Sequence, residues 1–373
     1  MWATWAWGAW WLAGLGVPLA QFHATSVEDS GWIALALWAL AAGWLSLWTP
    51  ERRKIGTGWI AALVAAWLVH PILVSWPALQ RSEWIDAWGL VSRLSASGCL
   101  AFALAWGTRS VLRHSPLIGV TLQIALASLL SANLLFTSLQ RQGVFSRWVW
   151  NEAADLGGIL SSQTVASAWC AIAIPLLLGL KGAARLWAVP AILGILSGPR
   201  TATAVALAVW ALWRWRSAFL SHPLASACVA FSVVLWWGLR VEGVSAIDAG
   251  IAPRLDTWPV ILGGIASHPF GIGWHPMAYA EIARSSPHPI MGHPSSSFLA
   301  WTLAGGWALG ASILAVLAWT MRDLGRSPLA GSLVVCLVFL CISRVIAQAQ
   351  VGALAWALWC LWRIERSEDG YVA

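Results

Sequence analysis

The sequence predicts an all-α membrane protein that crosses the bilayer about twelve times. Of its 373 residues, 59% are hydrophobic and only 10% are charged, and the mean hydropathy is +0.72. So few polar residues cannot cover a water-soluble globule of this size. Apolar runs of about 17–23 residues recur along the chain, and each can cross a hydrocarbon core roughly 30 Å thick. The runs show no alternation of period two, so helices are expected and barrel strands are not.

The expected spans form a single transmembrane domain over residues 1–373. They lie at about 2–20, 31–49, 56–75, 85–107, 116–139, 161–180, 184–197, 202–217, 219–239, 297–320, 328–343 and 346–362. The first run lacks a basic leading region and an A-x-A-like cleavage site, so a retained helix is favoured over a signal peptide. All six cysteines fall inside apolar runs, which favours small buried residues over disulfides or metal ligands.

Positive charge separates the two sides of the membrane. When alternate connections are assigned to opposite sides, thirteen of the 22 Lys and Arg residues fall on one side: Arg52, Arg53, Lys54, Arg109, Arg113, Lys181, Arg185, Arg214, Arg216, Arg322, Arg326, Arg363 and Arg366. This side is expected to be cytoplasmic and to hold both termini. The other nine arginines lie on or near the outer side, against the bias. Because the charges are dispersed in ones and twos, they do not indicate nucleic-acid binding.

The longest segment outside the expected spans, residues 240–297, falls on the outer side. Prolines in it punctuate short helical stretches such as 276–284, and its composition is not that of a disordered chain. Its aromatic residues include Trp258, Phe270, Trp274 and Tyr279. We therefore expect an extracytoplasmic catalytic loop that packs on the outer face as a lid, with the substrate between lid and helices.

Four of the eight histidines lie in this loop, at positions His268, His275, His288 and His293. Their spacing matches no standard metal site. A proline follows each histidine, and a role as turn residues is an adequate explanation for these His-Pro pairs. No metal is therefore expected. The chain also lacks an H-E-x-x-H motif and a Walker or dinucleotide glycine pattern. The serines that follow His293 lack the glycine setting of a serine nucleophile. Hydrolytic and nucleotide chemistry are therefore disfavoured.

Three outer-face residues suggest phosphate chemistry instead. Arg200 lies in 197-SGPRTATAVALAVW-210, Arg254 lies in 253-PRLDTW-258, and His293 precedes the tenth span in GHPSSSFL. Each alone fits an interfacial or solvated residue. Together they suit a lipid-linked phosphate or diphosphate, because guanidinium pairs with phosphate oxygens and a histidine can take a proton from an attacking hydroxyl. Such a site needs no metal, since the arginines can stabilise a leaving diphosphate.

In this order, the features resemble the O-antigen ligase and polymerase superfamily, which includes WaaL-type ligases and Wzy-type polymerases. The resemblance covers about residues 140–325. It rests on Ser-Gly-x-Arg at the outer end of a span, an early arginine and HPFGIGW in a long outer loop, and a histidine before an apolar run with Gly-Gly. It implies a GT-C-like bundle of roughly twelve helices. It also implies inverting, metal-independent and cofactor-free glycan transfer from undecaprenyl diphosphate.

The resemblance implies roles for individual residues. Arg200 and Arg254 would bind the diphosphate, and His293 would be the catalytic base. The stretch 157-GGILSSQTVAS-167 resembles the family's Gly-x-x-x-x-x-Asn segment, and Gln163 takes the place of its asparagine. Gln163 would therefore contact the substrate. Where the family often has His-x-His-Asn, the place of the second histidine falls here on Ser295. Apart from the resemblance, Arg344 in 341-CISRVIAQAQ-350 is either a further phosphate contact or a core arginine held by Gln348.

The expected activity is that of a polymerase in a bacterial inner membrane, with the active site on the periplasmic side. A ligase or a protein O-oligosaccharyltransferase is the alternative within the family, so the acceptor is a glycan, lipid A or a protein. A chain-length regulator is a candidate partner, and nucleic acid is not. Two other classes stay open. One is a transporter or flippase of a lipid-linked glycan, and the other is an assembly protein whose loop docks a partner.

Overall fold

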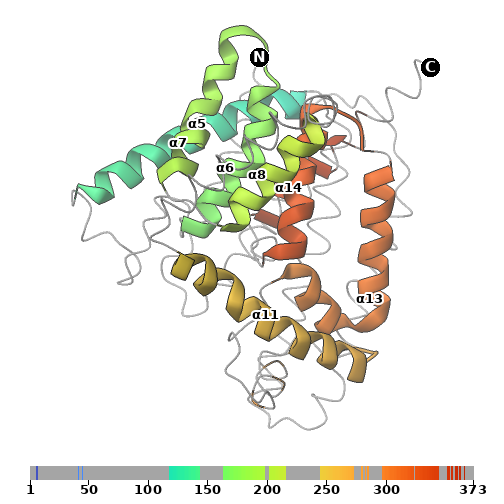
Figure 1. Ribbon diagram of the computed structural model, residues 1–373. Helices are drawn as coiled ribbons and strands as arrows, with labels where there is room; N and C mark the ends of the chain where they lie inside the picture. The colour runs from blue at the N-terminus through green and yellow to red at the C-terminus, as the bar shows by residue number, and fades with distance from the viewer. Residues whose placement is uncertain are drawn as a thin grey trace.

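The computed structural model describes residues 117–142, 163–197, 201–215, 244–272, 296–322 and 324–343. It also describes isolated positions, which are Ala6, Ala41, Trp44, Tyr279, Ile282, Arg284, 351–352, 354–355, 358–359, 361–362 and Glu365. Within these ranges every regular element is helical and none is a strand. The elements are α5 (Leu117–Arg141), α6 (Gln163–Leu178), η4 (Gly182–Ala188), α7 (Val189–Ser197), α8 (Thr201–Arg214), α11 (Val244–Ser267), α13 (Ser297–Arg322) and α14 (Pro328–Ile342) (Figure 1).

The all-α prediction is confirmed for the described part of the chain. Helices are present where spans were predicted at 116–139, 161–180, 202–217, 297–320 and 328–343. Two helical segments, Val120–Leu139 and Ser297–Arg322, are long and apolar enough to cross a membrane. The spans predicted at 2–20 and 31–49 are described only at Ala6, Ala41 and Trp44, which are helical. The spans predicted at 56–75, 85–107 and 219–239 lie outside the described residues.

The span predicted at 184–197 has a different form. A 3-10 helix, η4, leads into α7, an α-helix of only nine residues. Nine residues rise about 14 Å, which is less than a hydrocarbon core needs. Gly182 begins η4 at a φ of 59°. Pro190 lies in the first turn of α7, where proline is tolerated because the backbone N–H groups of a first turn make no hydrogen bond within the helix.

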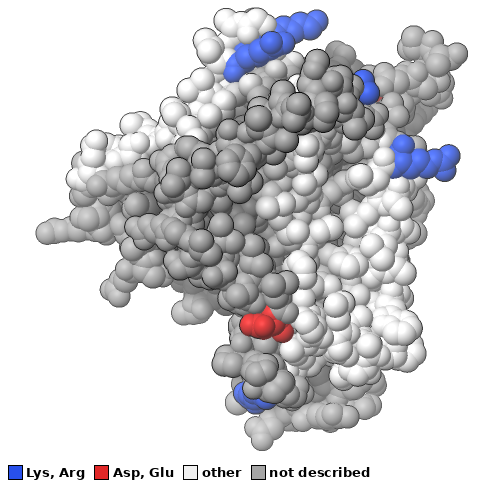
Figure 2. Space-filling model, viewed as in Figure 1, with Lys and Arg blue, Asp and Glu red and all other residues white. Residues whose placement is uncertain are grey.

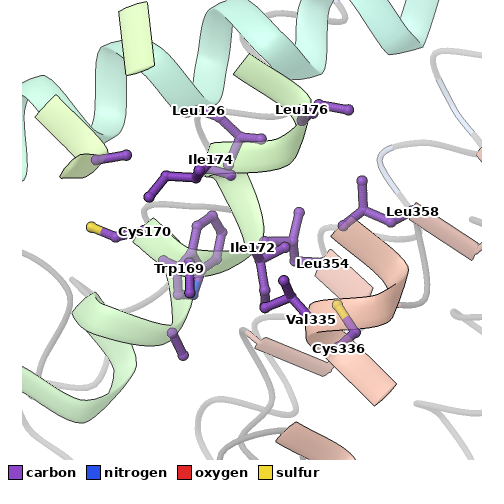
Figure 3. Close-up of a cluster of buried hydrophobic side chains, with 14 of the residues drawn as sticks. Leu126, Trp169, Cys170, Ile172, Ile174, Leu176, Val335, Cys336, Leu354 and Leu358 are labelled. Atoms are coloured by element: carbon purple, nitrogen blue, oxygen red, sulfur yellow. The ribbon is translucent and has the colours of Figure 1, made fainter. Parts of the chain in front are cut away.

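The core forms where α14 packs between α6 and α8. Ser332 Oγ in α14 donates a hydrogen bond of 2.7 Å to the carbonyl of Ile172 in α6. A Cβ atom on Gly331 would lie 2.7 Å from Nε1 of Trp210 in α8 and 2.9 Å from Cβ of Pro175. Small residues thus let the three helices approach closely, as packing inside a bilayer requires. Figure 3 shows apolar side chains of α6 and α14 meeting in this core.

The last predicted span, 346–362, is helical at its described positions. Val351, Leu354, Leu358 and Leu361 are buried. Their spacing of three and four residues places them on one helix face, which packs into the same core. Beyond them, Glu365 Oε2 accepts a hydrogen bond of 2.6 Å from Ser327 Oγ, the residue that caps the start of α14.

Helix directions separate two ends of the bundle. Gly179, after α6, packs against Pro328 at the start of α14, and Trp210 near the end of α8 packs on Gly331. The end of α6, the end of α8 and the start of α14 therefore lie together. We call this the basic end, because its connections and helix termini carry Lys181, Arg185, Arg214, Arg322 and Arg326. In Figure 2 the described surface between the ends of the molecule is broadly uncharged.

Candidate functional site at the opposite end

Two polar contacts define the end of the bundle that lies opposite the basic end. Thr203 Oγ1, at the start of α8, donates a hydrogen bond of 3.0 Å to Ser167 Oγ, near the start of α6. Ser297, at the start of α13, donates twice to the carbonyl of Ser343, once from its backbone N–H at 3.0 Å and once from Oγ at 2.9 Å. The starts of α6, α8 and α13 and the end of α14 therefore point to this opposite end.

The predicted site residues are adjacent in sequence to these helix termini. Gln163 is the first residue of α6, Arg200 immediately precedes α8, and Arg344 immediately follows Ser343. His293 precedes Ser296, the residue before α13, by three positions. Arg200, His293 and Arg344 themselves lie outside the described residues, and Gln163 is described only in its backbone. The described helix termini nearest to these four positions in sequence all lie at the opposite end.

Much of the predicted outer loop is one long helix. Residues 240–297 were expected to hold short helical stretches broken by prolines, but α11 runs unbroken for 24 residues through Pro253 and Pro259. Arg254 lies in its helical backbone, one residue after Pro253, and its side chain is not described. The shorter helix expected at 276–284 is confirmed at Tyr279, Ile282 and Arg284, which are helical.

Helix α11 lies across the bundle, below the group formed by α6, α8 and α14 (Figure 1). It contacts α13 near its own C-terminal end, where Gly264 is close to both Leu303 of α13 and Ile282. A Cβ atom at Gly264 would lie 3.2 Å from Leu303 Cδ1 and 3.1 Å from Ile282 Cδ1. The C-terminal part of α11 thus packs on the first half of α13.

Helix α13 is broken where this contact is made. Gly306 has a φ of 74° and a ψ of −172°, which separates a first half from a second half that continues to Arg322. Gly271, in the turn after α11, has a φ of 87° and meets the break directly. A Cβ on Gly306 would lie 2.7 Å from Gly271 N, and one on Gly271 would lie 2.7 Å from Gly306 N. Only glycine fits at both positions.

At the break, backbone N–H and C=O groups of α13 form hydrogen bonds with the turn after α11. Ile272 N donates a hydrogen bond of 3.0 Å to the carbonyl of Leu303, and Trp307 N donates one of 2.9 Å to the carbonyl of Pro269. Trp307 adds a third bond, 2.9 Å long, from its indole Nε1 to the carbonyl of Ile265 in α11. The HPFGIG sequence is therefore a docking segment that satisfies a broken helix.

His268 is the one loop histidine that the structure describes. Its Nδ1 lies 3.0 Å from the carbonyl of Gly264 and 3.0 Å from Ser267 Oγ, and the side chain is exposed. His275, His288 and His293 lie outside the described residues.

The serines after His293 have a packing role that their sequence did not reveal. Ser296 and Ser297 are fully buried. Ser296 Oγ accepts a hydrogen bond of 3.2 Å from Leu299 N, so Ser296 caps α13. The only sequence signal was the common use of serine as a helix cap.

Two further predictions meet the described residues. Cys170 and Cys336 are buried as expected, whereas Cys341 is exposed, so the prediction that all cysteines are buried is wrong for Cys341. Its position on α14 faces away from the core shared with α6 and α8. Within the described ranges, no group of three His, Cys, Asp or Glu side chains could hold a metal ion.

In its described part, the protein is all-helical. Two of its helical segments are apolar and long enough to span a membrane, and α11 packs against α13 at one end. No protein-family model matches the chain, and no curated protein is significantly similar to it.

Proposed function

We propose that the protein is a membrane glycosyltransferase that acts at the outer face on glycans linked to undecaprenyl diphosphate. One observation carries most of the weight. The sequence positions of Gln163, Arg200, Arg344 and His293 all adjoin helix termini at the end opposite the basic end. Arg254 lies on α11, the helix that covers this end. Arginines against the charge bias whose sequence positions adjoin one end of the bundle suit an anionic substrate at the membrane boundary.

The local packing supports this grouping in a second way. Ser297 and Ser343 are hydrogen bonded, so the chain segments that lead to His293 and to Arg344 start from one point. A Cα atom lies about 3.8 Å from that of its neighbour in the chain, which keeps Arg344 next to this point. The proposed base and the proposed phosphate-binding arginine must both reach a common substrate, and the Ser297–Ser343 junction supports this requirement.

The reaction proposed for this site is a single displacement. The acceptor hydroxyl oxygen attacks the anomeric carbon, and a C–O bond forms there with inversion. His293 takes the hydroxyl proton. The bond between the anomeric carbon and the diphosphate oxygen breaks, and its electron pair leaves with the diphosphate. Arg200 and Arg254 stabilise the negative charge that develops on the leaving group, with Arg344 and Gln163 as further substrate contacts.

We assign the protein to the polymerases of the O-antigen ligase and polymerase superfamily, with the acceptor a second lipid-linked glycan. This assignment includes a GT-C-like bundle of about twelve spans, both termini in the cytoplasm, and a site on the periplasmic side. The ligase and the protein O-oligosaccharyltransferase differ from it only in the acceptor. The acceptor therefore separates these three activities.

The test is a product analysis with purified protein in nanodiscs and a defined undecaprenyl-diphosphate-linked repeat unit. Mass spectrometry should show longer glycans with the repeat unit alone, or transfer to lipid A or a peptide if the acceptor assignment is wrong. Arg200→Ala, Arg254→Ala and His293→Ala should each lower the rate by at least about 100-fold. Arg322→Ala, at the basic end, is the matched control and should keep full activity. Full activity in all three site variants would refute the proposed site.

A transporter of lipid-linked glycan is the second candidate, and the break in α13 is the observation that favours it. Transporters often place a substrate at discontinuous helices, and Gly306 interrupts a helix of 26 residues. The two functions give different results in liposomes. Movement of the lipid-linked glycan across the bilayer without any change in glycan length would support transport and would contradict the transferase.

A further inference from the structure

A group of exposed apolar side chains surrounds the docked turn after α11. Phe270, at the tip of the turn, is 85% exposed, more than any other large hydrophobic residue among those described. Trp307, just past the break in α13, is 56% exposed, and Leu262 on α11 is 53% exposed. The hydrogen bond from Trp307 Nε1 to Ile265 joins α11 to α13 between these side chains. We call Leu262, Phe270 and Trp307 the aromatic turn patch.

The patch continues the exposed apolar surface of a helix that is able to span a membrane. In the second half of α13, Leu314 and Met321 are exposed to 53% and 54%. They follow Trp307 at intervals of seven residues, which is two helical turns, so the three form one stripe. No charged residue interrupts the helix before Arg322. The same uncharged surface therefore extends from the basic end to the patch.

The depth of Trp307 agrees with a position in the outer leaflet. Fifteen residues separate Trp307 from Arg322, a rise of about 22 Å along the helix. With Arg322 at the cytoplasmic boundary, Trp307 lies in the outer leaflet, about 8 Å below the outer boundary of a hydrocarbon core roughly 30 Å thick. The indole N–H of Trp307 already has a protein acceptor, so its ring needs no water and can lie among acyl chains.

We propose that the aromatic turn patch inserts into the outer leaflet and anchors the docked end of α11 to the membrane. The occupant of the patch is bilayer lipid, through the acyl chains of the outer leaflet. Because the anchored turn also closes the break in α13, the lipid contact holds α11 over the outer end of the bundle. This inference requires that α13 spans the membrane, and it does not depend on the chemistry proposed for the site.

Photocrosslinking in nanodiscs of phosphatidylethanolamine and phosphatidylglycerol tests the anchor. The full chain carries p-benzoylphenylalanine in place of Phe270, a side chain exposed enough for the replacement to leave the packing intact. A matched variant carries it in place of Leu314, on the stripe of α13, and another in place of Asp256, an exposed charged position on α11. Mass spectrometry of the irradiated protein then measures the fraction with an added phospholipid.

The expected result is a lipid-adduct fraction at position 270 similar to that at 314 and several-fold above that at 256. A fraction at 270 as low as at 256, while 314 gives adducts, would overturn the anchor. Adducts at 270 only with protein would overturn it as well and would identify the patch as a protein contact. The lipid-linked glycan is absent from the nanodiscs, so the result stands whether or not the transferase activity is found.

Discussion

Gly271 and Gly306 lie so close together that neither has room for a Cβ atom. Each has a positive φ, and a Cβ on either would come within 2.7 Å of the other's backbone nitrogen. One glycine ends the turn after α11 and the other breaks α13, and 35 positions of sequence separate them (306 − 271). The cover and the bundle are therefore joined through backbone, where a side chain would keep them apart.

Gly271→Ala and Gly306→Ala should each destabilise the protein by more than the backbone strain alone. A non-glycine residue in such a conformation costs about 1–3 kcal/mol, and the clash adds to this. Gly182→Ala separates the two causes, because Gly182 has a φ of 59° but an added Cβ meets nothing within 4 Å. The free energy of unfolding in mixed detergent should fall least for Gly182→Ala. An equal loss of unfolding free energy in all three variants would show that backbone strain alone causes the loss and that the clash of the added Cβ contributes nothing.

Gly331→Ala should lower stability, although the same change in an open helix raises it. Alanine favours an α-helix over glycine by about 1 kcal/mol. At Gly331 the new methyl would press on the indole of Trp210 and on Pro175, and such overpacking costs about 1–3 kcal/mol. Gly263→Ala in α11 is the control, since a Cβ there meets nothing within 4 Å. Thermal unfolding midpoints in detergent should shift in opposite directions for the two variants.

Ser297→Ala should cost about 1 kcal/mol of folding free energy, the usual net value of a hydrogen bond. Ser297 is fully buried, and its Oγ donates to Ser343 at the point where α13 meets α14. Ser312→Ala removes a hydroxyl of the same kind from an exposed position that bonds only within α13. It should change stability by a few tenths of a kcal/mol at most. Similar losses for both variants in a denaturation series would contradict the proposed importance of the junction.

The two ends of the bundle should be accessible from opposite sides of the membrane. In a cysteine-free background, Asp256→Cys on α11 should react in intact cells with a maleimide that cannot cross the inner membrane. Arg326→Cys, in the connection between α13 and α14, should react only after the cells are broken. The reverse pattern would place α11 in the cytoplasm, where a periplasmic glycosyltransferase could not use it.

Local sequence was enough to predict five of the described helices to within three residues at each end. The helices at Leu117–Arg141, Gln163–Leu178, Thr201–Arg214, Ser297–Arg322 and Pro328–Ile342 match runs predicted at 116–139, 161–180, 202–217, 297–320 and 328–343. The reason is physical: a run of apolar residues satisfies its own backbone as a helix, and its length and charged ends are visible in the sequence. The sidedness of the candidate site depends on the same signals.

Tertiary contacts decided the rest. Pro253 and Pro259 suggested short helical pieces, yet α11 is continuous, and the glycines of GIG and Gly-Gly gave no local sign that they meet. The buried Ser297, at the start of α13, also finds its partner, Ser343, only through the fold. By itself the sequence determined five of the described helices, their order and the expected direction of charge across the membrane. Which backbones approach closely enough to require glycine, and where a broken helix finds new hydrogen-bond partners, depends on residues that only folding brings together.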